Sequence, residues 1–185
     1  MKHFFPFILL SFSIFFLSFN ATAAQTLIRE TCQACCQRDP NLKFAFCTTS
    51  LDAAPASRCA SLRGLGMIAI RLVRFNVTDA RCHIKQLLKD KKIDAHVKPY
   101  LRDCLELYSD AIPSVKEAMK CYNSKKYLDA NVQMSYVMDA ATTCEDGFQE
   151  MKDGVSPLTK RNNDTFGLSA IALSIMHMLQ TGSNY

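Results

Sequence analysis

The chain contains nine cysteines, and these are the residues whose type and spacing are best suited to chemistry. The C-x-x-C spacing of Cys32 and Cys35 is found in redox sites and in zinc sites. A redox site of this kind needs a strand–helix–strand setting, and zinc needs a second pair of ligands. The sequence offers neither. We therefore interpret the stretch as structural, with one of Cys32, Cys35 or Cys36 forming a disulfide.

The other polar residues do not form a recognisable catalytic set. Cys82 and His83 are adjacent, but neighbouring residues of a helix point about 100° apart, so His83 is poorly placed as a base for that thiol. The remaining candidates are isolated in the sequence or fit solvated helix faces: His96, His177, Glu145, Asp146 and Glu150. The sequence therefore predicts no enzyme active site, no metal site and no cofactor.

The first residues indicate export. Phe4–Phe19 is an uncharged apolar run, and small residues follow it. This order is that of a secretory signal peptide cleaved after Ala23 or Ala24, and the run is short for a membrane span of about 20 residues. We expect residues 1–23 to be removed and residues 24–185 to remain as one secreted domain, without a membrane anchor.

Export makes disulfides the expected state of the cysteines, and an odd number leaves at least one thiol free or paired between molecules. The formal net charge is only +5. The positively charged residues are scattered among acidic ones along the chain, so nucleic acid is not an expected partner. Two sequons outside the signal, Asn76-Val77-Thr78 and Asn163-Asp164-Thr165, are candidate glycosylation sites.

Apolar residues recur at helical spacing in four long segments, and no segment shows a sustained strand-like alternation. Four long helices with short connections predict an all-α fold, an antiparallel up-and-down four-helix bundle over about residues 61–180. Two shorter helical runs precede the bundle and are separated by a break at Pro40. They predict an N-terminal helical hairpin over about residues 25–55, which Cys32 and Cys47 are able to staple.

Serine residues mark the expected helix starts. The first long helix should begin near Ser61, and Ser124 can cap the third long helix through its hydroxyl oxygen. Ser156 and Pro157 fit the cap and first position of the last helix. That last helix is very apolar from Phe166 to Leu179, so we expect it to be the most buried.

The second and third long helices should form a hairpin that is closed by a disulfide. Cys104 and Cys144 fall on the apolar stripes of these helices, at similar distances from the turn between them. A bond closing a loop of about 40 residues contributes roughly 4 kcal/mol; two buried thiols are the alternative. The hairpin would present Lys125, Lys126 and Tyr127 at its tip. Taken alone, these residues fit an ordinary polar turn.

A family resemblance is carried by elements spread from about Gln25 to Leu179. They are Thr31-Cys32, Phe46-Cys47, Leu101-x-x-Cys104-x-x-x-Tyr108 and Thr143-Cys144-Glu145-Asp146-Gly147-Phe148. Together they are similar to the plant invertase and pectin methylesterase inhibitor family. A closer likeness is to the branch of invertase inhibitors that includes plane-tree pollen allergens. It lies in Ser124–Tyr127, Asp139, Thr143–Phe148 and Val155–Lys160.

The resemblance implies the disulfides Cys32–Cys47 and Cys104–Cys144, and a bundle with an N-terminal helical hairpin. It also implies a monomeric protein that inhibits a cell-wall enzyme as a 1:1 complex. In the invertase-inhibiting branch, a Pro-Lys-Phe motif between the second and third bundle helices enters the enzyme's sugar cleft. The matching positions here are Lys125, Lys126 and Tyr127, so the lysine is kept, phenylalanine becomes tyrosine and proline is replaced.

The expected target is a plant acid invertase (β-fructofuranosidase), a retaining glycosidase with two carboxyl groups in its cleft. Lys126 would pair with the carboxylates, and Tyr127 would pack where a sugar ring sits. One alternative is inhibition of pectin methylesterase through the side faces of the second and third bundle helices. Another is a structural or pollen-associated protein without an enzyme target.

The sequence leaves three choices open. It does not choose between the two target enzymes, or between the apoplast and the vacuole. It also does not pair the cysteines beyond the four that the resemblance assigns: Cys35, Cys36, Cys59, Cys82 and Cys121.

Overall fold

The computed structural model describes residues 25–151 and 155–182. The predicted signal peptide, residues 1–23, lies outside the described residues. Within the described ranges every regular element is helical and no strand forms. The prediction of an all-α fold is therefore confirmed.

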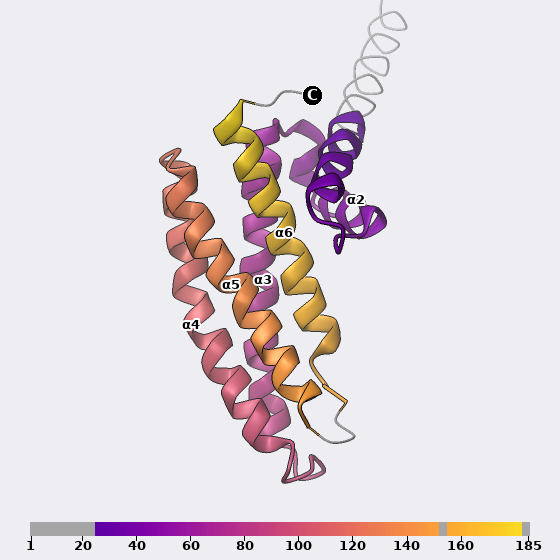
Figure 1. Cartoon of the computed structure of the whole chain (residues 1–185), viewed down its shortest axis with the longest axis vertical. Helices are drawn as coiled ribbons and strands as arrows, with labels where there is room; N and C mark the ends of the chain where they lie inside the picture. Colours follow the sequence, from indigo (N-terminus) through magenta and orange to yellow (C-terminus); the bar gives the residue numbers. More distant parts are fainter. Residues whose placement is uncertain (1–24, 152–154, 183–185) are drawn as a thin grey trace, which may run out of the picture.

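Four long helices form the bundle: α3 (Leu62–Lys89), α4 (Lys98–Asn123), α5 (Tyr127–Gln149) and α6 (Thr159–Thr181). Successive helices run antiparallel, as Figure 1 shows. α4 packs between α3 and α5, and α6 closes the bundle by packing on both α5 and α3. The amphipathic spacing of each helix turns its apolar stripe inward, and this burial is the main contribution to stability.

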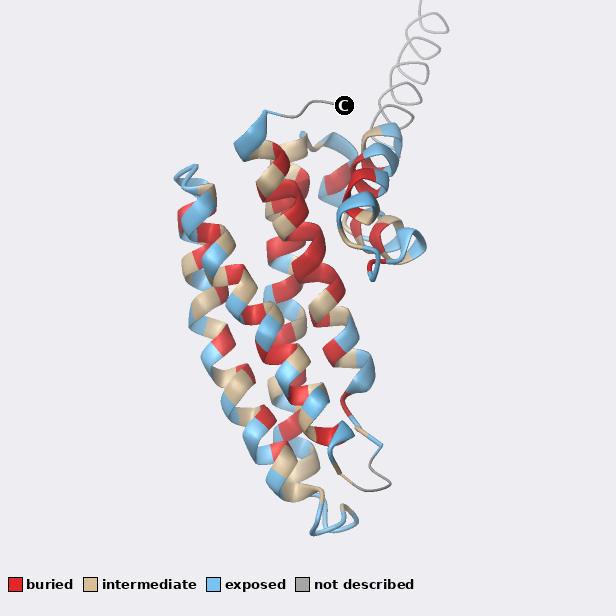
Figure 2. Cartoon of the chain, in the orientation of Figure 1, coloured by how far each residue is buried: buried red, intermediate tan, exposed pale blue. Residues whose placement is uncertain are grey.

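The core runs the length of the bundle and is densest along α6. In Figure 2 the buried positions of α6 form a nearly continuous band, whereas α4 and α5 alternate buried and exposed faces. α6 was expected to be the most buried helix, and its many small and apolar residues give it this central position. The largest fully buried side chains include Tyr108, Tyr122, Met134, Phe148, Ile171 and Ile175.

The N-terminal arm is a helical hairpin, as predicted. A helix over residues 25–38 and α2 (Phe44–Asp52) are joined by the Cys32–Cys47 disulfide, and the short 3₁₀ helix η1 (Pro55–Cys59) leads into α3. α2 packs on α6, where a Cβ at Gly167 would lie 2.6 Å from Cε1 of Phe46. Only glycine leaves room for that ring, so Gly167 permits the arm to dock.

The helix starts differ from expectation at two of three serines. Ser61 caps α3 as predicted, accepting the Gly64 N–H at 3.2 Å. Ser124 does not cap α5; it is the C-cap residue of α4, and α5 begins at Tyr127. Ser156 accepts the N–H of Leu158 at 3.1 Å, so the turn before α6 is longer than predicted and the helix begins at Thr159 rather than at Pro157.

Candidate functional site

The tip, residues 123–127, joins α4 to α5 by a turn made of backbone hydrogen bonds. The Lys126 N–H donates to the Cys121 carbonyl at 2.9 Å, and the Lys125 N–H donates to the Tyr122 carbonyl at 3.0 Å. This pair of bonds is the Schellman motif, which satisfies the last carbonyls of a helix. The motif requires a left-handed residue at the position after the C-cap, and here that residue is Lys125.

Lys125 has a φ of 59°, and among the described residues it is the one residue other than glycine with a positive φ. Glycine usually fills this position because the left-handed conformation costs other residues about 1–2 kcal/mol. Proline cannot adopt it, since its ring fixes φ near −65°. The turn is therefore incompatible with proline at position 125, where the Pro-Lys-Phe motif of the invertase-inhibiting branch has its proline. The turn also gives Lys125 a strained backbone conformation, and such strain is common at functional sites.

The tip rests on an aromatic support. The ring of Tyr127 meets the ring of the buried Tyr122 edge-on, with centroids 5.2 Å apart and planes at 66°. The Tyr122 hydroxyl donates to the Arg63 carbonyl at 2.8 Å, and Arg63 Nη2 donates to the Asn123 carbonyl at 3.0 Å. Burial raises the pKa of Tyr122 well above its usual range, so the hydroxyl remains a donor. The start of α3 thus fixes the end of α4.

Gly66 makes room for this support. A Cβ at that position would lie 2.1 Å from the Tyr122 hydroxyl oxygen and 2.8 Å from Cγ2 of Ile175. Neither neighbour has free space, because Tyr122 and Ile175 are both fully buried. The tyrosine can therefore reach Arg63 only because residue 66 is glycine.

The tip presents two cations beside an aromatic ring. Lys125 and Lys126 are exposed and Tyr127 is half-buried. A shallow depression between the tip and the C-terminal end of α6 is lined by Lys125, Lys126, Tyr127, Leu128, Asp129, Leu179 and Gln180. These groups can pair with carboxylates and pack against a sugar-sized surface, but they include no nucleophile with an adjacent base.

An apolar stripe continues from the tip along the solvent face of α5. Leu128, Val132 and Tyr136 are spaced four residues apart and are 68%, 60% and 46% exposed. Residues at this spacing lie on one face of a helix. We call these three residues the α5 stripe. Farther from the tip, the same face carries the exposed acids Asp139 and Asp146.

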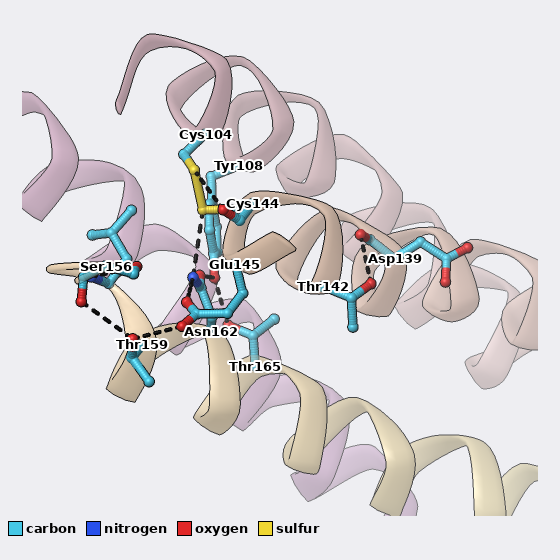
Figure 3. Close-up of a disulfide and its surroundings, with 11 residues drawn as sticks. Cys104, Tyr108, Asp139, Thr142, Cys144, Glu145, Ser156, Thr159, Asn162 and Thr165 are labelled. Carbon is cyan, nitrogen blue, oxygen red and sulfur yellow. Dashed lines mark hydrogen bonds between the residues drawn. A yellow bond between two sulfur atoms is a disulfide. The ribbon is translucent and has the colours of Figure 1, made fainter. Parts of the chain in front are cut away.

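The opposite end of the α4–α5 hairpin is fastened by the Cys104–Cys144 disulfide and by buried hydrogen bonds (Figure 3). The Tyr108 hydroxyl donates to Asn162 Oδ1 at 2.7 Å, and Asn162 Nδ2 donates to Glu145 Oε2 at 2.6 Å. Burial raises the pKa of Tyr108 to about 12. These bonds hold the start of α6 against α4 and α5. With Thr159 and Thr165 they form what we call the disulfide-end network: Tyr108, Glu145, Thr159, Asn162 and Thr165.

This network corrects one prediction and adds residues that sequence reasoning missed. Glu145 was expected on a solvated face, but it is half-buried and accepts hydrogen bonds from Asn162 and from the Thr159 hydroxyl at 2.6 Å. Asn162 is 2% exposed although it lies in the polar first turns of α6, between Arg161 and Asn163. Because its neighbours in the sequence are polar or charged, no local pattern distinguishes this buried asparagine from a solvated one.

Comparison with known proteins decides the family. Residues 26–175 match the family model described as "Plant invertase/pectin methylesterase inhibitor". The chain belongs to this family. The inhibitor is 43% identical to the "Putative invertase inhibitor" of Platanus acerifolia, over 92% of this chain and 98% of that protein. It is 34% identical to "Pectinesterase inhibitor 12" of Arabidopsis thaliana, again over 92% and 98% of the two chains.

Solved structures support the fold. A crystal structure of a mutant form of a pectin methylesterase inhibitor from Arabidopsis matches with a TM-score of 0.65 at 24% identity, over 73% of this chain and 89% of that one. The relatives are named as inhibitors of invertase or of pectinesterase, and the present protein is accordingly an inhibitor and not an enzyme.

The two disulfides of the inhibitor are those that the resemblance implies, and the other cysteines remain as thiols. Cys35 and Cys121 are buried, Cys36 is partly buried, and Cys59 and Cys82 are exposed. Cys59 and Cys82, whose pairing the sequence left open, are not joined to each other. Burial raises the pKa of Cys35 to about 12, which keeps this thiol protonated and unreactive.

The remaining candidates do not converge on a site. Burial lowers the pKa of His83, with a further contribution from Arg161. In the described part of the chain, no three histidine, cysteine or acidic residues are arranged to hold a metal ion. None of the helices formed by the described residues combines the length and the apolar character needed to cross a bilayer.

Proposed function

We propose that this inhibitor blocks a plant acid invertase (β-fructofuranosidase) by inserting its tip into the active-site cleft of the enzyme as a 1:1 complex. The observation that carries the proposal is the strained Lys125 beside Lys126 and Tyr127 at the end of a rigid hairpin. The names of the plane-tree relatives support the choice of invertase as target.

Lys126 is the residue to which we assign the main contact. It is fully on the solvent side of the turn, and its ammonium group can reach the carboxylates expected in the cleft of a retaining glycosidase. Tyr127 then packs beside it as the aromatic part of the contact. A charge pair of this kind contributes most when the surrounding rim excludes water from it.

Pre-organisation of the tip supports binding. The Schellman bonds fix the backbone, Tyr122 supports Tyr127, and Arg63 holds the carbonyl of Asn123. Because the turn is ordered before the enzyme arrives, binding loses less conformational entropy.

The test is titration of a purified acid invertase with the wild-type inhibitor and with Lys126→Ala. Removing one partner of a desolvated charge pair costs about 2 kcal/mol or more, which is roughly a 30-fold or greater rise in the inhibition constant. Lys91→Ala is the matched control, since it removes the same charge from an exposed position in the α3–α4 connection. Equal potency of the two variants would exclude Lys126 from the mechanism.

A second candidate function is inhibition of pectin methylesterase through the side of the bundle. The α5 stripe supports it, because an exposed apolar row on a helix face is suited to a protein contact. Titrating pectin methylesterase with Val132→Lys and with Lys126→Ala separates the two modes. Under the side-face mode only Val132→Lys weakens inhibition, whereas a tip-mediated complex is weakened by Lys126→Ala.

We also propose that the inhibitor acts outside the cytoplasm. The support is the signal-like composition of residues 1–23 and the disulfides Cys32–Cys47 and Cys104–Cys144, which persist in oxidising compartments. The apoplast is the expected site and the vacuole is the alternative. Imaging a fluorescent fusion to the C-terminus of the full chain in plant cells tests this location; cytoplasmic fluorescence would contradict it.

A further inference from the structure

The two sequons have very different surroundings in the folded chain. Asn76 lies in the middle of α3, and its side-chain nitrogen is already occupied. Asn76 Nδ2 donates to the Arg161 carbonyl at 3.0 Å and to the Thr165 hydroxyl at 2.6 Å. Both acceptors belong to α6, so the amide of Asn76 is one of the polar contacts that join α3 to α6.

A glycan on Asn76 is incompatible with these contacts. The amide nitrogen has two hydrogens, and attachment of a sugar replaces one of them. One of the two acceptors would lose its donor. Thr165 is 0% exposed, so the lost bond would leave a buried hydroxyl with fewer partners. A glycan at Asn76 therefore disturbs the packing of α3 on α6.

Asn163 has the opposite setting. It is exposed on α6, between the buried Asn162 and the half-buried Asp164. No hydrogen bond ties its side chain to another described residue. A sugar at this position projects into solvent, which is where glycans on folded proteins lie.

We propose that Asn163 is the N-glycosylated residue of this inhibitor and that Asn76 is unmodified. The sugar donor is a lipid diphosphate-linked oligosaccharide. A bond forms between Asn163 Nδ2 and the anomeric carbon, the bond from that carbon to phosphate oxygen breaks, the lipid diphosphate leaves, and the amide gives up one proton. The inference rests on the proposed export of the chain.

The position of the glycan limits what it can affect. Asn163 lies on the rim of a groove between the arm, α5 and α6, which is also lined by Asn41, Lys43, Phe46, Glu145 and Asp146. The glycan therefore covers this groove. It lies near the start of α6, whereas the tip is at the end of the bundle where α6 finishes (Figure 1).

The experiment measures the mass of the inhibitor secreted by plant cells before and after enzymatic removal of N-glycans. The full chain is compared with a version in which an established secretory leader replaces residues 1–23, so failure of export is distinguished from failure of glycosylation. The variants are Asn163→Gln and Thr78→Ala. Thr78→Ala removes the Asn76 sequon and leaves the Asn76 amide in place, because the Thr78 hydroxyl bonds only the Arg74 carbonyl of its own helix.

The expected result is one glycan on the wild type and on Thr78→Ala, and none on Asn163→Gln. Three outcomes would overturn the proposal. They are a glycan that remains on Asn163→Gln, a second glycan that disappears in Thr78→Ala, and an unmodified wild type that was secreted with the established leader.

Discussion

The α4–α5 hairpin has two ends that are built in different ways. At one end, the Cys104–Cys144 disulfide and the disulfide-end network join three helices through buried side chains. At the other end, the tip is held by backbone hydrogen bonds and leaves Lys125 and Lys126 in solvent. The first end concentrates interactions that stabilise the fold, whereas the second keeps strained and charged groups available for a partner.

This difference indicates that one end of the hairpin stabilises the fold and the other end binds the partner. Changes at the disulfide end should alter the free energy of unfolding and leave the folded tip able to inhibit. Changes at the tip should alter inhibition with little effect on stability. The support formed by Tyr122, Arg63 and Gly66 should affect both properties, because Tyr122 and Gly66 are buried and the support contacts the tip.

The largest expected effect is loss of the hairpin disulfide. The double variant Cys104→Ser/Cys144→Ser should lower the free energy of unfolding by about 4 kcal/mol, because the unfolded chain regains the freedom of a long loop. Chemical denaturation measures the change. Cys32→Ser/Cys47→Ser is the control: it opens a loop with a sequence separation of 15 rather than 40, and about 3 kcal/mol is expected. A larger loss in the control would contradict the prediction that the Cys104–Cys144 bond stabilises the fold more than the Cys32–Cys47 bond does.

Gly66→Ala should lower both the stability of the fold and the strength of inhibition. The added methyl group collides with the Tyr122 hydroxyl and Ile175, so we expect a loss of about 1–3 kcal/mol in unfolding free energy together with weaker inhibition.

Gly147→Ala is the matched control, because the nearest atom to its new Cβ is Tyr100 Cδ1 at 3.9 Å. In that open helical position alanine should stabilise by about 0.5–1 kcal/mol. Thermal unfolding and invertase titration of both variants check the pair, and equal stability of the two would refute the tight fit around Gly66.

Tyr108→Phe tests the disulfide end with a smaller change. It removes the hydroxyl that donates to Asn162 and leaves a buried carbonyl oxygen without this donor, at a cost of about 1–3 kcal/mol. Inhibition measured well below the unfolding temperature should be unchanged. A rise in the inhibition constant of the folded variant would show that the two ends are coupled.

Lys125→Gly should give the smallest change in stability, and in the opposite direction. Glycine adopts the left-handed conformation without strain, and after allowing for its extra freedom in the unfolded chain a gain of up to about 1 kcal/mol is expected. Inhibition should weaken because one exposed cation is lost. Denaturation and titration of the same preparation test both parts, and a loss of stability would mean that the Lys125 side chain stabilises the fold.

The helices and the two disulfides were predictable from the sequence because their signals are local or repeated. The apolar stripes of α3 to α6 follow the helical period over many residues, and Cys104 and Cys144 fall on facing stripes. The family resemblance gave the same two disulfides. The short break at Pro40 was enough to separate the two helices of the arm.

What the sequence did not predict depends on contacts between distant segments. The role of Glu145 is set by Asn162 and Thr159 on the next helix, and the occupied amide of Asn76 is set by residues of α6. Ser124 was misplaced for a different, local reason. The Schellman bonds end α4 without using a serine cap, so α5 starts later than propensity alone suggests.

The turn at the tip has a consequence for how such proteins diversify. Its shape is fixed by the backbone bonds from Lys125 and Lys126 to the end of α4, and neither bond uses a side chain. Most substitutions at these two positions therefore change the recognition chemistry while the loop keeps its form. Proline at Lys125 is the exception, because it cannot take the required backbone angle. Relatives that exchange these residues can acquire new targets without having to evolve a new fold.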